Sequence, residues 1–422
     1  MRVPLPFGRS QVEVEVPDTA TVLRPRAVPP LADPEGAVRE LLRSPTFGPP
    51  LRDLARGAGS AAIVISDVTR PVPNRLLLPA LIEELNASGI PDAGITILNG
   101  TGLHRPNTEA ELREMLGDLA ESYRIVQHEA RRRETLVEVG RSARGAPVEL
   151  CRTYVEADLR IVTGFVEPHL FAGYSGGAKG VMPGVAGAEI VMSNHGAENL
   201  SHPRARWCVA AGNPVFDEMR AIAGLCPPHF LLNVTLDSER RITGAFAGDW
   251  RQAHDAAIEQ AARQHTVAVP GPFDIVVVTN MGYPADLNLY QSVKGMSVAA
   301  EAVREGGSIL LVAACEDGLG SDDYVRFLTG RESPEALLAS ILGAEAPRHD
   351  QWQVQVQAMV QRKAAVYLHS RLSREATEAA HLRYSANPSE TLARLIADAR
   401  SQGLPGSVLV LPHGQLTVPV IA

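Results

Sequence analysis

The sequence is poor in several features that would place a chain in a particular class. It holds four cysteines, Cys151, Cys208, Cys226 and Cys315, with no CxxC pair, so neither a disulfide framework nor a zinc knuckle is indicated and buried thiols are expected. No segment reaches about 18 uninterrupted apolar residues, and no apolar run of signal-peptide length follows the first residue. These absences predict a cytoplasmic protein without a membrane span.

A run of charge of one sign is also missing. The chain carries 40 Lys and Arg against 48 Asp and Glu, which gives a net charge of −8 over 422 residues. Proteins that bind nucleic acids or anionic membranes show basic patches, so neither class of partner is expected and a small-molecule partner fits better. With 45 % apolar residues the chain can bury a full core, and its length predicts two domains.

Strand, polar loop and helix recur in that order along the chain. Three apolar runs predict buried strands, at 61–66, 94–99 and 159–164, and the loops that follow them are 67–74, 100–107 and 164–187. This order is typical of βαβ units, and it predicts an α/β fold with mostly parallel sheets. Because loops at the carboxyl ends of parallel strands line one crevice, the three loops are expected to face the same space.

The pattern indicates a domain boundary near Pro270. Between the second and third loops, residues 136–140 and 147–151 predict a hairpin that extends the sheet or covers its edge. The second domain is expected to have strands at 273–279, 308–313, 366–369 and 407–412 and helices at 297–304, 324–329, 333–342 and 389–401. The predicted domains are therefore residues 1–270 and 271–422, with the ligand site in the cleft between them.

The loop after the third strand carries most of the chemistry. Its glycines would let backbone N–H groups approach an anion, and Lys179 adds a point charge, so by itself this loop is typical of a phosphate site. The segment that follows ends at His195, an imidazole that a plain phosphate site does not need, and a metal ligand or an acid/base is the sharper interpretation. In the second domain, residues 280–296 carry amide, phenol and ammonium groups that suit a carboxylate.

Six motifs in sequence order carry a resemblance to a known family. They are Asp67-Val-Thr-Arg-Pro, Gly102-Leu-His-Arg-Pro-Asn-Thr, Glu167-Pro-His-Leu-Phe-Ala-Gly-Tyr-Ser-Gly-Gly-Ala-Lys, Asn194-His195, Tyr290-Gln-Ser-Val-Lys-Gly-Met and Asp350-Gln-Trp352. Together they resemble the lactate racemase family of nickel-pincer-nucleotide enzymes. The resemblance covers both domains, and the chain departs from the family pattern at Ala178, where members often carry Arg.

The resemblance implies a racemase or epimerase of a 2-hydroxy acid, with its active site between the two domains. A nickel-pincer nucleotide (pyridinium-3,5-bisthiocarboxylic acid mononucleotide nickel), covalently bound through Lys179 with His195 as the metal ligand, would accept a hydride from C2 of the substrate. His104 and His169 would be the catalytic acid/base pair, since a neutral imidazole can take and return the hydroxyl proton. The partners would be a small 2-hydroxy acid and the cofactor-biosynthesis proteins of the nickel-pincer pathway.

The other site residues implied by the resemblance fall into two groups. The residues implied for the substrate are Arg70, Tyr290, Gln291 and Lys294, and those implied for the cofactor are Lys179, Asp67, Thr69, Ser175, Gly176, Gly177 and Trp352. Arg and Lys would hold the substrate carboxylate by charge-assisted hydrogen bonds. The first domain would thus carry the tether, the nickel ligand and the acid/base pair, and the second would contribute substrate-binding residues.

Two other functions stay open from the residues alone. A catalytically inactive module that binds a phosphorylated metabolite or nucleotide would need only the glycine-rich loop. A hydrolytic zinc enzyme would use His104, His169 and His195 as ligands, although the chain has no HExxH-type helix. Taken singly, Lys179 is most simply a phosphate contact, and for Trp352 a packing role competes almost equally with a site role. The remaining histidines, including His128, His202, His229 and His254, lie in no matched motif and receive no role.

Overall fold

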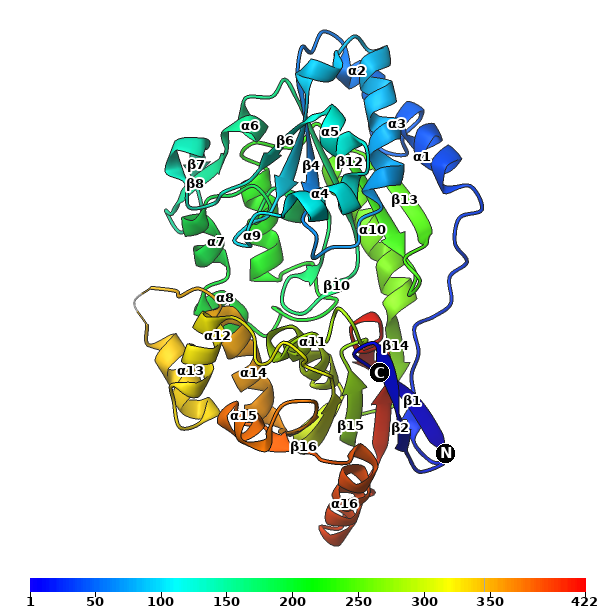
Figure 1. The fold of residues 1–422 in the computed structure, drawn as a ribbon, viewed down its shortest axis with the longest axis vertical. Helices are drawn as coiled ribbons and strands as arrows, with labels where there is room; N and C mark the ends of the chain where they lie inside the picture. The colour runs from blue at the N-terminus through cyan, green and yellow to red at the C-terminus, as the bar shows by residue number, and fades with distance from the viewer. Residues whose placement is uncertain (345) are drawn as a thin grey trace.

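The N-terminal domain is built on a six-stranded sheet in the order β13-β12-β9-β4-β5-β6, as seen in a computed structural model that describes residues 1–344 and 346–422 (Figure 1). The strands are β4 (Ala61–Ser66), β5 (Ile95–Gly100), β6 (Arg124–Gln127), β9 (Leu159–Phe165), β12 (Phe230–Leu236) and β13 (Ile242–Gly248). Neighbouring strands are parallel except β12 and β13, which form an antiparallel hairpin. The predicted α/β class with mostly parallel sheets is confirmed.

Helices pack on both faces of this sheet because successive strand residues point to opposite sides. Ile63 and Ile65 of β4 belong to one buried cluster with Leu81, whereas Val64 belongs to another with Met219. The helices of this half are α1 (Pro34–Arg43), α2 (Leu51–Ala55), α3 (Asn74–Ala87), α4 (Glu109–Leu116), α5 (Leu119–Ser122), α6 (Arg152–Val155), α7 (Ala188–Asn194), α8 (Ala197–Ser201), α9 (Pro214–Ala223) and α10 (Trp250–His265), with 3-10 turns η1 (Asp92–Gly94), η2 (Arg133–Thr135) and η3 (Gly177–Gly180).

The C-terminal domain has a second six-stranded sheet, in which all neighbouring strands are parallel, in the order β18-β17-β16-β15-β19-β3. Its strands are β15 (Phe273–Thr279), β16 (Val303–Val312), β17 (Ala365–His369), β18 (Arg383–Tyr384), β19 (Val408–Leu411) and β3 (Thr21–Val22). Its helices are α11 (Leu289–Ala299), α12 (Asp322–Thr329), α13 (Pro334–Leu342), α14 (Gln351–Lys363), α15 (Arg374–Ala379) and α16 (Pro388–Ser401), with the 3-10 turn η4 (Gly414–Leu416).

The first residues of the chain pack with the C-terminal sheet. The hairpin of β1 (Arg2–Phe7) and β2 (Ser10–Glu15) buries Leu5 and Val14 in the same cluster as Val277, and β3 pairs with β19. Both termini accordingly lie beside the lower domain in Figure 1, where β14 (Thr266–Val269) pairs with β20 (Val418–Ile421). Residues 1–22, which the linear division places in the first domain, are therefore part of the second sheet and its cover.

One sequence-based expectation was wrong, and another was confirmed in part. The predicted hairpin is present as β7 (Leu136–Arg141) and β8 (Pro147–Cys151), but it forms a separate sheet of two strands and does not extend the six-stranded sheet. It braces the glycine-rich loop, because the backbone N–H of Cys151 donates to the carbonyl of Val185 at 2.8 Å. The helix expected at 297–304 lies instead at Leu289–Ala299 and is followed by β16.

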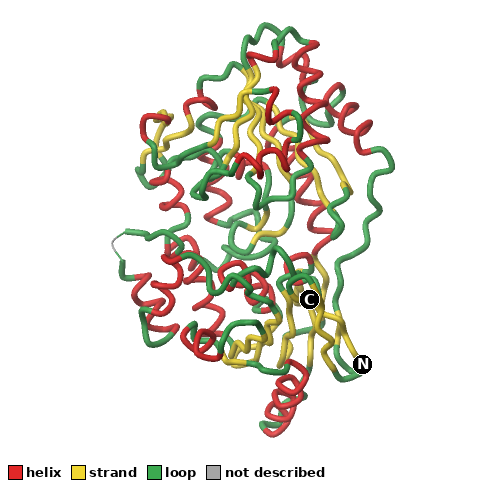
Figure 2. The backbone as a smooth tube through the Cα atoms, in the orientation of Figure 1, coloured by secondary structure: helices red, strands yellow, loops and turns green. Residues whose placement is uncertain are grey.

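The shift of that helix has a local cause. The side chain of Asn288 caps its first turn by accepting the backbone N–H of Gln291 at 3.0 Å. Polar residues that were interpreted as part of a loop therefore sit on the first turns of α11. None of the helices in the described part of the chain combines the length and the apolar character of a membrane span. The region between the two sheets is occupied mainly by loops (Figure 2).

Candidate active site

The candidate site is formed where three parallel strands end. The last residues of β4 and β5 are paired with each other, and β9 lies on the other side of β4. Asp67 on the loop after β4 contacts His104 on the loop after β5, and Arg70 on the first loop lies 3.4 Å from Glu167 on the loop after β9. The prediction that the three loops face the same space is confirmed.

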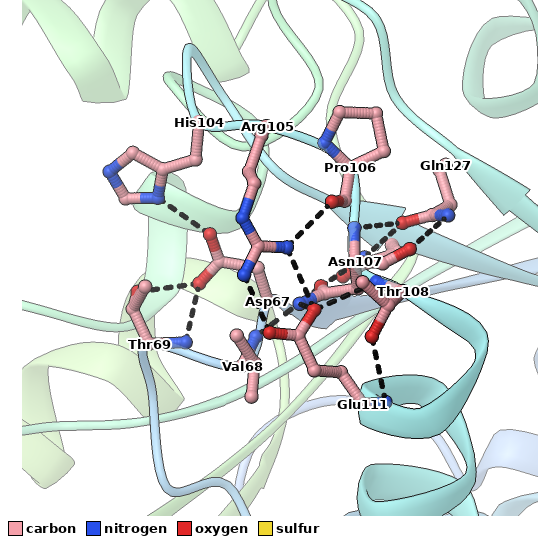
Figure 3. Close-up of polar contacts among 11 residues, drawn as sticks. Asp67, Val68, Thr69, His104, Arg105, Pro106, Asn107, Thr108, Glu111 and Gln127 are labelled. Carbon is pink, nitrogen blue, oxygen red and sulfur yellow. Dashed lines mark hydrogen bonds and ion pairs between the residues drawn. The ribbon is translucent and has the colours of Figure 1, made fainter.

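Asp67 holds His104 in one orientation (Figure 3). It is 4 % exposed, its Oδ2 lies 2.6 Å from Nδ1 of His104, and its Oδ1 accepts the hydroxyl of Thr69 at 2.6 Å. Burial raises the pKa of Asp67, but the hydrogen bonds from His104 and Thr69 and the charge of Arg70 outweigh it, so the pKa lies below its usual value. The ionised carboxylate accepts Nδ1–H, which leaves the lone pair of a neutral His104 on Nε2.

Amide groups fix the loop that carries His104 (Figure 3). Oδ1 of Asn107 accepts from Nδ2 of Asn99 at 2.7 Å, and the backbone N–H of Asn107 donates to Oε1 of Gln127 at 2.6 Å. Thr108 then caps α4. His104 therefore projects from a loop bonded to two strands and a helix, although its own side chain is 56 % exposed.

The glycine-rich loop is held by hydrogen bonds of its own residues. The hydroxyl of Ser175 donates to the carbonyl of Phe165 and accepts the backbone N–H of Glu167, each at 2.9 Å. The N–H of Gly177 donates to Oδ1 of Asn233 at 2.8 Å. The Ser175 hydroxyl and the Gly177 N–H, which belong to residues predicted to contact the cofactor, therefore shape the turn that carries Lys179.

A buried histidine lies behind this turn. Nε2 of His254 bonds to the carbonyl of Ser175 at 2.9 Å, and burial lowers the pKa of His254 to about 4, so the ring is neutral at physiological pH. A Cβ built on Gly177, which has φ of 54°, would lie 2.1 Å from Nδ1 of His254. The packing of the loop on this imidazole therefore requires glycine at 177. Neither His254 nor Asn233 could be found from a local motif, because each meets the loop from a distant part of the chain.

Cationic groups from both domains lie close enough to influence one another. The chain contains three lysines, Lys179, Lys294 and Lys363, and the first two belong to this group. Burial, followed by the charges of Arg70 and Lys294, lowers the pKa of Lys179 to about 7. Burial and Arg70 also lower the pKa of Lys294 to about 8, against the opposing effect of Glu167. An amine can lose its proton under these conditions, whereas arginine cannot.

Glu167 is the acidic partner of this group and was given no role by the sequence. Burial raises the pKa of Glu167, while the nearby charges of Arg70 and Lys294 act in the opposite direction. Lys294 also donates to Oε1 of Gln291 at 3.1 Å, one turn away on α11. Gln291 and Lys294 therefore lie together on α11, and Arg70 of the other domain is near enough for its charge to act on Lys294. Their roles toward a substrate stay a prediction.

Two neutral imidazoles face the same cations. Burial, followed by the charge of Lys179, holds the pKa of His169 well below its usual value and lowers that of His195 to about 3. Nδ1 of His169 accepts the backbone N–H of Ala172 at 3.2 Å, so the proton of the neutral ring is on Nε2. The ring of Phe171 lies between the two imidazoles, edge-on to each, at centroid distances of 4.7 and 5.0 Å.

An aromatic group from α14 closes the site from the C-terminal domain. Trp352 is 9 % exposed and packs edge-on against His195 at 5.7 Å, and its Nε1 donates to the hydroxyl of Tyr290 at 3.2 Å. That hydroxyl donates in turn to Oδ1 of Asp350 at 3.1 Å. Trp352 is therefore both a packing residue and part of the wall beside His195. Asp350 belongs to a matched motif, and its contact with Tyr290 could not be inferred from spacing.

The zinc interpretation finds no support in this geometry. Among residues 1–344 and 346–422, no three His, Cys, Asp or Glu side chains are grouped so that they could hold a metal ion. Ala178 is 2 % exposed and packs in the core, so the position beside Lys179 supplies no cation.

Known protein families and relatives match nearly the whole chain. Residues 7–208 match the lactate racemase N-terminal domain family, and residues 269–420 match the lactate racemase C-terminal domain family. A lactate racemase of Thermoanaerobacterium thermosaccharolyticum is 36 % identical over 365 residues, 85 % of each chain. One of Lactiplantibacillus plantarum is 36 % identical over 326 residues, 76 % of each chain.

Solved structures give the same result. The lactate racemase apoprotein of T. thermosaccharolyticum superposes with a TM-score of 0.93 at 32 % identity, covering 99 % of this chain and all of the other. A protein of Thermotoga maritima, at 18 % identity, shares the fold with a TM-score of 0.70 over 94 % of this chain and all of its own. These similarities favour an isomerase over an inactive binding module. The chain belongs to the lactate racemase family and is an isomerase of the racemase type.

Proposed function

We propose that this racemase inverts C2 of a 2-hydroxy acid by reversible hydride transfer to a nickel-pincer nucleotide that is covalently bound through Lys179. The relatives are named for lactate, a 2-hydroxy acid, and we extend that substrate class to this chain. The observation that carries the proposal is the placement of His169 and His195 edge-on to the ring of Phe171, at centroid distances of 4.7 and 5.0 Å, near enough to Lys179 that its charge lowers the pKa of both imidazoles.

The residues present fit the cofactor. A neutral amine is the nucleophilic form of lysine, and the charged neighbours of Lys179, Arg70 and Lys294, are both positive, so they disfavour its protonation. Nδ1 of His195 lies 3.1 Å from Oδ1 of Asn194, which leaves Nε2 as the atom that would bind nickel. When bound, the nickel-pincer nucleotide supplies a reversible acceptor for the C2 hydride of the substrate.

The two predicted acid/base residues carry their protons on opposite nitrogens. His104, held by Asp67, has its lone pair on Nε2 and can take the proton of a substrate hydroxyl. His169 has its proton on Nε2 and can donate a hydrogen bond to an oxygen on the other side of the substrate. Loss of the hydroxyl proton and the C2 hydride leaves a planar keto acid. Return of the hydride to the opposite face of C2, with a proton to the oxygen, would invert the centre.

The carboxylate of the substrate would lie among the cations at the domain boundary. Arg70 comes from the first domain and Lys294 from the second, so an acid bound to both would join the two halves of the cleft. The hydroxyl of Tyr290 and the amide of Gln291 lie on the same helix as Lys294. Glu167 would balance these charges when no acid is bound, since it lies 3.4 Å from Arg70.

A racemisation assay in heavy water tests the reaction. Protein made in a host with the cofactor-biosynthesis proteins of the nickel-pincer pathway would be given single enantiomers of a panel of 2-hydroxy acids, with chiral chromatography as the readout. Hydride transfer predicts that both enantiomers keep their original C2 hydrogen, because a transferred hydride does not exchange with solvent. Deuterium at C2 of the product would instead show deprotonation at carbon and would contradict the proposal. Protein from a host without the pathway is the matched control.

A further inference from the structure

Asn194 connects His195 to a carboxylate that belongs to no matched motif. Nδ1 of His195 lies 3.1 Å from Oδ1 of Asn194, whose side chain is fully buried. On the other side of that amide, Nδ2 donates to Oε2 of Glu218 at 2.8 Å and to the carbonyl of Val215 at 3.2 Å. Three residues, His195, Asn194 and Glu218, thus form a continuous chain of hydrogen bonds.

The chemistry of these groups fixes which way the Asn194 amide points. A carboxylate and a carbonyl can only accept, so the NH₂ group of Asn194 must face Glu218 and Val215. Its Oδ1 must then face His195. Because an amide oxygen only accepts, Nδ1 of His195 must be the donor. This conclusion follows from the partners and does not depend on how the amide atoms are assigned.

The proton on Nδ1 determines the state of the other ring nitrogen of His195. A neutral imidazole carries one N–H, so Nε2 of His195 holds a lone pair. Histidines that bind metals are commonly fixed in this way, by a hydrogen bond from the second ring nitrogen. The same ring is clamped edge-on between Phe171 and Trp352, at centroid distances of 5.0 and 5.7 Å, so its plane is set as well as its tautomer.

Glu218 is itself held in place. It lies on α9, which is capped by Asn213, and Nδ2 of Asn213 donates to the carbonyls of Phe171 and Val209 at 2.9 Å each. A second amide converges on the same carboxylate oxygen, because Nδ2 of Asn199 lies 3.3 Å from Oε2 of Glu218. Two donors on one oxygen fix the carboxylate, and through it the orientation of Asn194.

We propose that Glu218 is a positioning residue, which acts through Asn194 to hold His195 as the Nδ1–H tautomer and so to present Nε2 to the metal. The use of that lone pair for nickel rests on the proposed function. The tautomer itself is a property of this chain with or without a cofactor, and it can be measured separately.

The test is ¹⁵N NMR of the apoprotein labelled in the histidine rings, with the His195 signals assigned by their loss in His195→Gln. Wild-type His195 should show an N–H at Nδ1 and a pyridine-type nitrogen at Nε2. Glu218→Ala should leave both tautomers populated, because one of the two acceptors for the Asn194 amide is gone. Asn194→Ala should shift the proton to Nε2. Glu218→Gln is the matched control, since its carbonyl still accepts from Asn194, and it should keep the wild-type spectrum.

Nickel content after cofactor loading gives a second readout. Loss of an outer-shell partner commonly costs 10- to 100-fold in metal affinity, so Glu218→Ala should retain nickel poorly against competing chelator while Glu218→Gln retains it. A wild-type spectrum with the proton on Nε2 would overturn the inference, as would a Glu218→Ala protein with unchanged tautomer and nickel retention. If the tautomer depends on Glu218 but wild-type protein binds no nickel, the positioning role of Glu218 stands and the proposed function fails. If Asn194→Ala does not fold, the Glu218 pair still decides the question.

Discussion

The amine of Lys179 should titrate near neutral pH, and this can be measured before any cofactor is bound. Burial and the charges of Arg70 and Lys294 lower its pKa to about 7. About half of the amines would then be neutral at pH 7, against roughly one in a few thousand for a lysine with the usual pKa of about 10.4. Lys294→Met removes one of the two cations while keeping a side chain of similar length. The pKa should rise in this variant but stay well below its usual value, because burial is the largest cause and Arg70 remains.

Competitive labelling with an amine-directed reagent over a pH series, followed by peptide mass spectrometry, measures this titration. With three lysines in the chain, every labelled peptide has one assignment. Lys363, which donates to the carbonyl of Ala300 at 2.6 Å and lies outside the cleft, is the internal reference. Arg70→Met should raise the pKa of Lys179 more than Lys294→Met, since Arg70 is the larger of the two charge effects. Half-maximal labelling of Lys179 only at the alkaline pH of an ordinary lysine would refute the reasoning.

Four other substitutions, one of them with a control variant, test the loops at the ends of strands β4, β5 and β9. His104→Ala and His169→Ala should each slow racemisation by about 100-fold or more at unchanged nickel content, and a near-normal rate in either loaded variant would contradict the acid/base pair. Asp67→Asn should lower kcat by about tenfold or more with little change in KM, because a neutral amide no longer stabilises the imidazolium of His104, and equal kcat values would remove Asp67 from the mechanism. Gly177→Ala should cost about 2–4 kcal/mol of unfolding free energy in chemical denaturation, since it adds a clash to an unfavourable φ. Gly57→Ala is its control, because Gly57 has φ of 81° with nothing within 4 Å of an added Cβ, so it should lose only about 1–2 kcal/mol, and equal losses would argue against the clash.

Sequence patterns predicted the parts of the fold that depend on residues close to one another in the sequence. The strands β4, β5 and β9 appear as apolar runs because both their faces are buried, and the rule for parallel sheets then brings their following loops together. The order of the C-terminal sheet could not be predicted, because β3 near the N-terminus pairs with β19 near the C-terminus, and no local pattern specifies so distant a partner. The start of α11 was missed because its polar first turns read as a loop until Asn288 is seen to cap them.

Some features of the site could likewise be predicted from the sequence, and others could not. Residues in the motifs, such as Lys179 and His104, could be chosen from the sequence. Their protonation could not be predicted, because the pKa of Lys179 depends on burial and on a cation from the other domain. The supporting roles of His254 and Glu218 could not be predicted for a related reason. Each reaches the site from a helix distant in sequence, and neither lies in a motif.

The most direct test of the central claim is the mass and metal content of one active preparation. Enzyme purified from a host that makes the cofactor should contain about one nickel per chain, and after denaturation it should carry an adduct on the peptide with Lys179. Lys179→Ala should lose the adduct, whereas His195→Ala should keep the adduct and lose nickel. An active enzyme that contains no nickel, and whose mass is that of the bare chain, would contradict the account.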